Sequence, residues 1–199
     1  IGIMLPKKID IVIPAHNEDL NLKYLLPKIV KIIKSNKLYK FRLVLIDDKS
    51  EDTTLNVIKN FKKKNSFIRI IKNKNKSGQT ICYKKYLQNF TSDYFIRIDA
   101  DNQDNPKYLK KMISLVKKNF DVILAKRTIR KHSLYMIILT FLYDKLIYFL
   151  IKEKLETYSS SLGCFKRSYL SFTNLRYNDH RYFPLIALNK GARKIKIFK

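Results

Sequence analysis

The chain has 199 residues, of which 46% are hydrophobic, so it can bury a substantial core and suits one domain better than two. Its 42 Lys and Arg outweigh 16 Asp and Glu, and the formal net charge of +26 suggests an anionic partner: nucleic acid, an acidic membrane surface or a phosphorylated substrate. Two cysteines and three histidines, scattered along the chain, argue against a disulfide framework or a zinc site and fit a reducing cytosol.

The first two predicted strands are each followed by a predicted helix. The opening stretch, IGIMLPKK, is too short to contain the apolar region of a signal peptide. After it comes a β-rich run at 9–15, and then apolar residues at helical spacing over 17–35. A second buried-strand pattern covers 41–48, and Ser50 is the expected N-cap of the helix that follows.

Three further strands and two further helices continue this alternation. The strands are expected at 67–73, 93–101 and 121–127, and the helices from after Gly78 to about Asn89 and over 106–119. Proline suits the first turn of a helix, which is where Pro106 falls. Strands that alternate with helices indicate βαβ units, a mostly parallel sheet and therefore an α/β fold.

Polar side chains follow three of these strands at the point where each strand ends. In open parallel sheets, ligands bind beyond the carboxyl ends of the strands. The side chains that should meet at this edge are Asn17 and Glu18, Asp47 and Asp48, and Asp99 and Asp101. The sequence therefore predicts an acidic site at one edge of the sheet.

The second half of the chain is less regular. Residues 133–154 are strongly apolar, but Asp144 and Lys145 interrupt them, so we do not expect a transmembrane helix. A core helix and a helix lying in the membrane interface fit this segment equally well. Beyond it the sequence predicts a loop with a short strand at 159–170, a helix at 180–191 that Gly191 ends, and a last strand at 194–198.

Asp99 and Asp101 lie two residues apart, so in extended backbone both side chains would point to the same side. Two adjacent carboxylates repel each other unless a cation or proton lies between them. Mg²⁺ and Mn²⁺ prefer oxygen ligands, and Gln103 could add a carboxamide oxygen. A solvated acidic turn explains the same residues equally well.

Asp47 and Asp48, with Ser50 and Asp52 after them, form a second acidic cluster. A carboxylate at a strand end can accept hydrogen bonds from a nucleotide base or from ribose hydroxyls. Acidic and hydroxyl side chains also cap helices, and both roles can hold together. The chain has neither GxGxxG after the first strand nor GxxxxGK[ST], which disfavours a dinucleotide-binding fold or a P-loop kinase.

Three stretches together resemble a known family. IVIPAHNED, LVLIDDKSEDTT and IDADNQDNP are similar, in order and interval, to the N-terminal signatures of family 2 glycosyltransferases with the GT-A fold, and the third contains that family's DxD motif. The resemblance is closest to the polyprenyl-phosphate branch, which includes dolichyl-phosphate mannose synthases and bactoprenol glucosyltransferases. AKRTIRKHS and NDHRYFPLIALNKGARKIKI resemble later segments of that branch, so the similarity covers nearly the whole chain.

The resemblance implies roles for individual residues. A nucleotide-sugar-binding part at about 8–127 would precede an acceptor and membrane-facing part at about 128–199. The nucleotide-sugar pocket would be formed by Pro14, Ala15, His16, Asn17, Glu18, Asp47 or Asp48, Ala100 and Arg127. Asp99, Asp101 and Gln103 would hold Mg²⁺ or Mn²⁺, with Asp101 central to catalysis. Arg127, Arg130, Lys131 and Arg181 would face the diphosphate or the acceptor phosphate, although Arg130 and Lys131 also fit an exposed basic helix start.

The implied activity is an inverting transfer of a sugar from a UDP- or GDP-sugar to a polyprenyl phosphate, at the inner face of the cell membrane and with peripheral membrane contact. Transfer to a saccharide hydroxyl is the alternative, with Asp179 as general base or, structurally, as the N-cap of the next helix. A nucleic-acid-binding protein is a more distant alternative, because the basic residues are spread along the chain.

The sequence departs from the family pattern at three places. His16 stands where the branch usually has Tyr, and only Gly78 represents a turn that is usually richer in glycine. The chain stops at Lys199, where the branch continues into a basic acceptor loop and, in many members, transmembrane helices. We expect either a truncated chain or membrane contact through residues 133–154.

Overall fold

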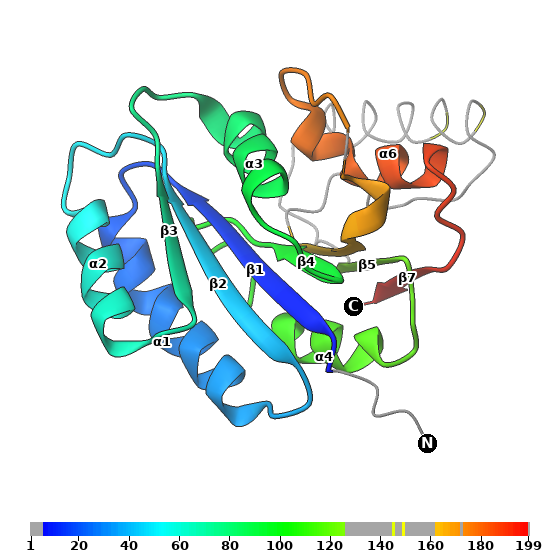
Figure 1. Cartoon of the computed structure of the whole chain (residues 1–199), viewed down its shortest axis with the longest axis horizontal. Coiled ribbons are helices and arrows are strands. Elements are labelled where there is room, and N and C mark those ends of the chain that lie inside the picture. Colours follow the sequence, from blue (N-terminus) through cyan, green and yellow to red (C-terminus); the bar gives the residue numbers. More distant parts are fainter. Residues whose placement is uncertain (1–5, 126–144, 146–148, 150–161, 172, 199) are drawn as a thin grey trace.

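The described residues form one mixed sheet with helices on both faces (Figure 1). The structure is a computed structural model, and it describes residues 6–125, 145, 149, 162–171 and 173–198. The strands are β1 (Lys8–Ala15), β2 (Lys40–Asp47), β3 (Ile68–Lys72), β4 (Tyr94–Arg97), β5 (Val122–Ala125), β6 (Gly163–Lys166) and β7 (Ile195–Phe198). The helices are α1 (Asp19–Ser35), α2 (Thr54–Lys64), α3 (Gly78–Asn89), α4 (Lys107–Val116) and α6 (Phe183–Asn189), with 3₁₀ turns η1 (Arg167–Tyr169) and η2 (Asp179–Tyr182).

The seven strands lie in the order β3-β2-β1-β4-β6-β5-β7. β1 pairs in parallel with β2 and β4, β2 with β3, and β5 with β7, whereas β6 runs antiparallel between β4 and β5. The predicted α/β fold with a mostly parallel sheet is therefore confirmed. Because β1 is central among the parallel strands, the carboxyl ends of β1, β2 and β4 are neighbours.

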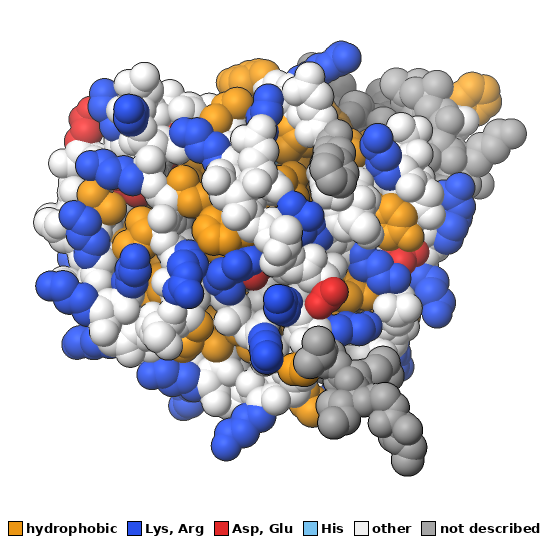
Figure 2. All heavy atoms as spheres, in the orientation of Figure 1, with side chains coloured by type: hydrophobic (Ala, Val, Ile, Leu, Met, Phe, Trp, Pro, Cys, Tyr) orange, Lys and Arg blue, Asp and Glu red, His pale blue; other side chains and the backbone are white. Residues whose placement is uncertain are grey.

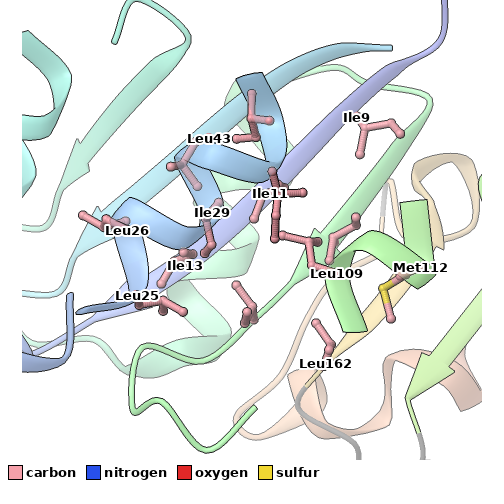
Figure 3. Packing of buried hydrophobic residues seen from close by; sticks show 14 of the residues in the cluster. Ile9, Ile11, Ile13, Leu25, Leu26, Ile29, Leu43, Leu109, Met112 and Leu162 are labelled. Carbon is pink, nitrogen blue, oxygen red and sulfur yellow. The ribbon is translucent and has the colours of Figure 1, made fainter. Parts of the chain in front are cut away.

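Alternation along the strands divides the core between the two faces of the sheet. On β1, Ile9, Ile11 and Ile13 face one way and pack with α1, α2 and α4, as Figure 3 shows for part of this cluster. Val12 faces the other way and packs with α3 and α6. Each fully buried aliphatic side chain contributes about 1.5–3 kcal/mol, so these two layers hold the strand ends in place.

The start of α2 differs from the prediction. The helix begins at Thr54 with Thr53 as its N-cap residue, so Ser50 as N-cap was wrong. The hydroxyl of Ser50 instead accepts a hydrogen bond from the backbone N–H of Asn17, at 3.1 Å. The physical reason is competition for one acceptor. The loop after β1 passes close to Ser50, so the backbone N–H of Asn17 binds the hydroxyl that would otherwise cap the helix.

Most of the apolar segment 133–154 lies outside the described residues, so its two interpretations stay predictions. Lys145 and Phe149 are described, and both are helical and exposed. Among the helices that the structure describes, none is long and apolar enough to span a bilayer.

Candidate functional site

A cavity of about 250 Å³ opens where the carboxyl ends of β1, β2 and β4 meet the first turn of α3. Three segments of the sheet edge and one helix end supply its walls. It is lined by Pro14, Ala15, His16, Glu18, Asp48, Lys76, Gly78, Gln79, Cys82, Asp99, Ala100 and Asp101. Four of these side chains are carboxylates and one is a lysine, which is the reverse of the charge balance of the whole chain.

The chain turns sharply after each of the three strands that reach the cavity. Asn17, Lys49 and Asn102 all have positive φ angles, of 56°, 58° and 58°. Asparagine adopts this left-handed region more readily than most residues, which suits Asn17 and Asn102. Lysine has no such preference, so the conformation of Lys49 is less favourable. The residues just before these turns, His16, Asp48 and Asp101, all line the cavity.

Asp48 is held by donors from the other side of the cavity. Its Oδ1 accepts hydrogen bonds from Asn73 Nδ2 at 2.7 Å and from the Ser77 N–H at 2.9 Å. Its Oδ2 accepts one from the Gly78 N–H at 2.7 Å. Burial alone would raise the pKa of Asp48, but these hydrogen bonds outweigh it and lower the pKa below 3.8. Asp48 therefore stays ionised and fixes the start of α3 to the end of β2.

Asn73 extends this arrangement behind the cavity wall. Its side chain is fully buried, and its Oδ1 accepts a hydrogen bond from Lys85 Nζ at 2.7 Å. Its Nδ2 also lies 3.4 Å from the sulfur of Cys82. Burial, and then the charge of Asp48, raise the pKa of the Cys82 thiol to about 12. The thiol is accordingly a neutral wall of the cavity and not a nucleophile.

The loop after β1 is bound to the loop after β2 along its length. His16 Nδ1 lies 3.0 Å from the carbonyl oxygen of Asp48, and the Glu18 N–H donates to the hydroxyl of Thr54 at 2.7 Å. The Glu51 N–H donates to the side-chain oxygen of Asn17 at 2.9 Å. The two strand ends thus form one rigid rim, which suits a site that must hold a ligand in one orientation.

Glu18 also connects this rim to the turn that follows β4. Its Oε2 accepts a hydrogen bond from Asn21 Nδ2 at 2.6 Å. Asn102 Nδ2 in turn donates to the side-chain oxygen and the carbonyl of Asn21, at 3.0 and 3.1 Å. The position of the acidic turn therefore depends on the first turn of α1.

Asp99 and Asp101 both reach the cavity, but not by the predicted geometry. β4 ends at Arg97, and Ala100 and Asp101 lie in a turn, so the argument from extended backbone was wrong. The physical reason is that the backbone leaves the strand after Arg97 and turns at Ala100 and Asp101, so the two side chains do not follow strand alternation. Asp99 Oδ1 accepts a 3.3 Å hydrogen bond from Gln79, and Asp101 Oδ1 accepts a 3.0 Å bond from the Gln103 N–H.

These two carboxylates fit a hard divalent cation. Mg²⁺ sites typically use one or two carboxylates, while substrate phosphates and water complete the shell. Within the described ranges, no group of three or more His, Cys, Asp or Glu is placed to hold a metal ion by itself. A site with two protein carboxylates therefore needs a ligand that brings its own oxygens, such as a diphosphate.

The segment that carries Asp179 and Arg181 lies beside the cavity and does not line it. Asp179 opens η2, and its Oδ2 accepts a hydrogen bond from the Arg176 N–H at 2.6 Å. The N-cap residues are Asn178 for η2 and Tyr182 for α6, so Asp179 as N-cap of the following helix was wrong. The chain turns at Asn178, where φ is 66°, and the carboxylate of Asp179 therefore lies close to the N–H of Arg176, three residues earlier.

The structure thus sorts the predicted residues into three groups. Those brought together at the cavity are Pro14, Ala15, His16, Glu18, Asp48, Asp99, Ala100 and Asp101. Those described but not lining it are Asn17, Asp47, Gln103, Asp179 and Arg181. Asp47 is fully buried, and Arg181 is exposed. Arg127, Arg130 and Lys131 lie outside the described residues, and the roles of all these residues stay predictions.

Sequence reasoning missed the contribution of α3. Lys76, Gln79 and Cys82 line the cavity, and Asn73 and Ser77 support it. A signal was present, because residues after β3 had to reach the same sheet edge as those after β1, β2 and β4. Gly78 marked the turn, and its φ of 80° lets its N–H point at Asp48.

The family profile described as "Glycosyl transferase family 2" matches residues 10–172. Among similar proteins, an undecaprenyl-phosphate 4-deoxy-4-formamido-L-arabinose transferase from Proteus mirabilis is 24% identical over 192 residues, which cover 96% of this chain and 58% of the relative. The protein of the same name from Salmonella choleraesuis is 28% identical over 193 residues, which cover 94% of this chain and 57% of the relative. The chain therefore spans less than three fifths of these relatives.

Solved structures share the fold at low identity. A mannosyltransferase from Pyrobaculum calidifontis, in complex with GDP-Man and Mn²⁺, has a TM-score of 0.68 and 12% identity, covering 98% of this chain and 55% of that one. S. aureus TarS 1-349 in complex with UDP-GlcNAc has a TM-score of 0.69 and 19% identity, covering 96% and 56%. The similarity extends across the sheet and the strand ends that form the cavity.

Proposed function

The chain belongs to glycosyl transferase family 2, and from this premise we propose that it moves a sugar, with inversion, from a nucleotide-diphosphate sugar to a polyprenyl phosphate. The observation that carries the proposal is the cavity, where Asp99 and Asp101 face the loop after β1 and the start of α3. The similar proteins from Proteus mirabilis and Salmonella choleraesuis are named as undecaprenyl-phosphate transferases, which favours this acceptor class.

The donor nucleotide would lie against the rim formed by the loops after β1 and β2. Asp48 is the better candidate of the two predicted carboxylates, because it lines the cavity and Asp47 does not. Its Oδ2 accepts one hydrogen bond from the protein, which leaves capacity for one from a base or ribose. Its main role would nevertheless be to fix the rim.

Asp99 and Asp101 would hold Mg²⁺ or Mn²⁺, consistent with the Mn²⁺ present in two similar structures. When bound, the cation neutralises the diphosphate as it leaves and polarises its bond to the sugar. The carboxylates of this chain could orient that cation, because Gln79 donates to Asp99 and Asn102 ties the turn that contains Asp101 to Asn21. The predicted contribution of Gln103 would require its exposed side chain to turn toward the cavity.

The acceptor would enter from the side of η2. A polyprenyl phosphate is already ionised at neutral pH and needs no general base, whereas a sugar hydroxyl does. Asp179 does not line the cavity, and one of its carboxylate oxygens accepts from the Arg176 N–H, so its place beside the cavity favours the phosphate acceptor, which needs no base. Arg181 is exposed and available to a phosphate, and Arg127, Arg130 and Lys131 would assist it.

A lipid acceptor implies work at a membrane surface, and we place the protein there as a peripheral enzyme on the cytoplasmic face. The net charge of +26 would favour contact with anionic lipid. Figure 2 shows Lys and Arg scattered over the whole visible face and not gathered in one stripe. That distribution suits a weak attraction to a surface better than specific binding to nucleic acid.

A product screen tests the proposal. UDP- and GDP-sugars are incubated with the protein, Mn²⁺ and a short-chain polyprenyl phosphate, and the lipid fraction is analysed by mass spectrometry. We expect one sugar to appear on the lipid phosphate, and Asp101→Asn to lose the product. Glu51→Gln, a charge change at an exposed residue outside the cavity, should retain it. Absence of any sugar on the lipid phosphate with every donor would contradict the proposed acceptor class.

A further inference from the structure

Arg97 is an arginine buried in the core, two residues before Asp99. It lies in β4, and only 3% of its surface is exposed. Its Nη1 donates a hydrogen bond to the carbonyl oxygen of His180, and its guanidinium lies 5.8 Å from the ring of Phe165 and 5.6 Å from that of Phe183. Burying a guanidinium is costly, and a hydrophobic side chain would fill this space at lower cost.

His180 is held by three contacts to two elements. Its carbonyl binds Arg97 of β4, its Nδ1 lies 2.7 Å from the hydroxyl of Thr80 in α3, and its ring stacks on Tyr83, also in α3. Burial, followed by the charges of Arg97 and Arg181, lowers the pKa of His180 to about 4. The ring is therefore neutral at physiological pH, and the Thr80 hydroxyl can donate to Nδ1.

These contacts join the two sides of the proposed reaction. Thr80 follows Gln79, which donates to Asp99, and Arg97 precedes Asp99 in the chain. His180 lies between Asp179 and Arg181 in η2, the turn from whose side the proposed acceptor would enter. A shift of η2 would therefore change the distance between Arg181 and the carboxylates that face the leaving diphosphate.

We propose that Arg97, Thr80 and His180 form a latch that positions η2 for the acceptor, with Arg97 as a positioning residue. The inference rests on the proposed function for its effect on turnover, but the latch itself is a property of the fold. The latch explains why an arginine is buried at this position, because an apolar side chain could not donate a hydrogen bond to the backbone of η2. The donor cavity does not include any of the three residues.

Arg97→Met tests the latch with an unbranched, flexible apolar side chain that is shorter than arginine, lacks the hydrogen-bond donors and can still pack near Phe165 and Phe183. Hydrogen exchange of the backbone amides in 176–182, followed by mass spectrometry, should become about tenfold faster, as expected for one lost charged hydrogen bond. Exchange in α2 should stay at the wild-type rate. Arg69→Met, at an exposed residue of β3, serves as the matched control and should change neither.

Kinetics then test the positioning role. In Arg97→Met, kcat/KM for the polyprenyl phosphate should fall about tenfold, while the affinity for the donor nucleotide with Mn²⁺ stays within about twofold. Arg97→Lys should recover part of the loss, because an ammonium can still donate to the carbonyl. Thr80→Val should act in the same direction with a smaller effect, and it carries the test if Arg97→Met does not fold.

Unchanged exchange in 176–182 would overturn the latch, whatever the enzyme does. Faster exchange with unchanged acceptor kinetics would overturn the positioning role. If wild-type protein transfers no sugar to a lipid phosphate, the proposed function fails, and the exchange data alone then decide whether the latch exists. Faster exchange together with a selective loss in acceptor kcat/KM supports the whole inference.

Discussion

Two buried carboxylates at opposite ends of the parallel strands, Asp10 and Asp48, are held by different kinds of donor. Asp10 lies near the start of β1 and receives both Arg42 Nε and Nη2, at 3.0 and 2.6 Å, as well as the hydroxyl of Tyr86 at 2.8 Å. Asp48 follows β2 and receives only neutral donors, from Asn73, Ser77 and Gly78. One edge of the sheet therefore has a closed ion pair, and the other keeps a net negative charge beside a cavity.

This difference in donors explains how a chain with a formal net charge of +26 can offer a site for a cation. At the Asp10 edge the guanidinium is close at hand, and Phe90 covers it at 4.5 Å. At the Asp48 edge, Lys85 binds the side-chain oxygen of Asn73 and not the carboxylate. Amide donors hold Asp48 in place without cancelling its charge, so the field in the cavity stays negative.

The largest expected effect is a loss of activity from a substitution at the edge of the sheet that carries the cavity. Asp101→Asn should reduce kcat by about 10²–10³-fold, because a neutral amide holds a divalent cation poorly where charge develops on the diphosphate. The free energy of unfolding should change little, since Asp101 is partly exposed. Initial rates with Mn²⁺ and urea unfolding of the same preparations check both parts. An equal loss of activity in Glu51→Gln would contradict the assignment.

Asp10→Ala should act in the opposite way, on stability and not on ligand binding. Removing one partner of a buried ion pair leaves Arg42 without its carboxylate and typically costs about 3–5 kcal/mol. Urea unfolding should show this loss, while nucleotide affinity of the protein that remains folded should stay at the wild-type value. A drop in nucleotide affinity without a drop in stability would refute the division between the two edges.

Asn73→Ala should lower both the stability and the nucleotide affinity, with smaller effects than the two preceding substitutions have on activity and on stability. It removes one of the two hydrogen bonds to Asp48 Oδ1 and leaves Lys85 without the side-chain oxygen of Asn73, which costs about 1–3 kcal/mol. With that hydrogen bond lost, the pKa of Asp48 should rise, and nucleotide binding should weaken. Asn56→Ala, at an exposed position of α2, provides the matched control. Wild-type stability in Asn73→Ala would show that the network behind the cavity is not needed.

The smallest predicted effect is on pH dependence. The pKa of His180 is lowered from 6.5 to about 4, so the unfolded chain binds a proton that the folded chain does not. Stability should fall as pH decreases from 6.5 to about 4, by about 1 kcal/mol once solvent screening is allowed for. The lowered pKa of Asp48 adds a further loss below pH 3.8. Unfolding curves of His180→Phe should be flatter between pH 6.5 and 4, and identical slopes would contradict the assignment.

The sheet edge was predictable because it depends on local patterns. Apolar runs of β1, β2 and β4 identify the strands, and parallel topology then places Glu18, Asp48 and Asp99 together. The turn at Ala100 and Asp101 was not predictable, because the argument from spacing assumed that the strand continued to Asp101, whereas β4 ends at Arg97. Asp99 and Asp101 nevertheless line the cavity, and their role as metal ligands stays a prediction.

The remaining errors and omissions all involve contacts between distant parts of the chain. Ser50 was predicted as a cap, but it binds the backbone of Asn17 on another loop. The antiparallel insertion of β6 depends on pairing with β4 and β5, which no local pattern encodes. The sequence analysis assigned no role to Arg97, which is buried and donates to the carbonyl of His180, far along the chain.

The most direct test of the central claim is metal binding at Asp99 and Asp101. Mn²⁺ binding is measured by electron paramagnetic resonance in the presence of UDP or GDP, for the wild type and for Asp99→Asn, Asp101→Asn and Glu51→Gln. With one of the nucleotides, we expect the first two variants to bind Mn²⁺ at least about tenfold more weakly than the wild type and Glu51→Gln to bind equally. Equal Mn²⁺ affinity in all four proteins would contradict the account.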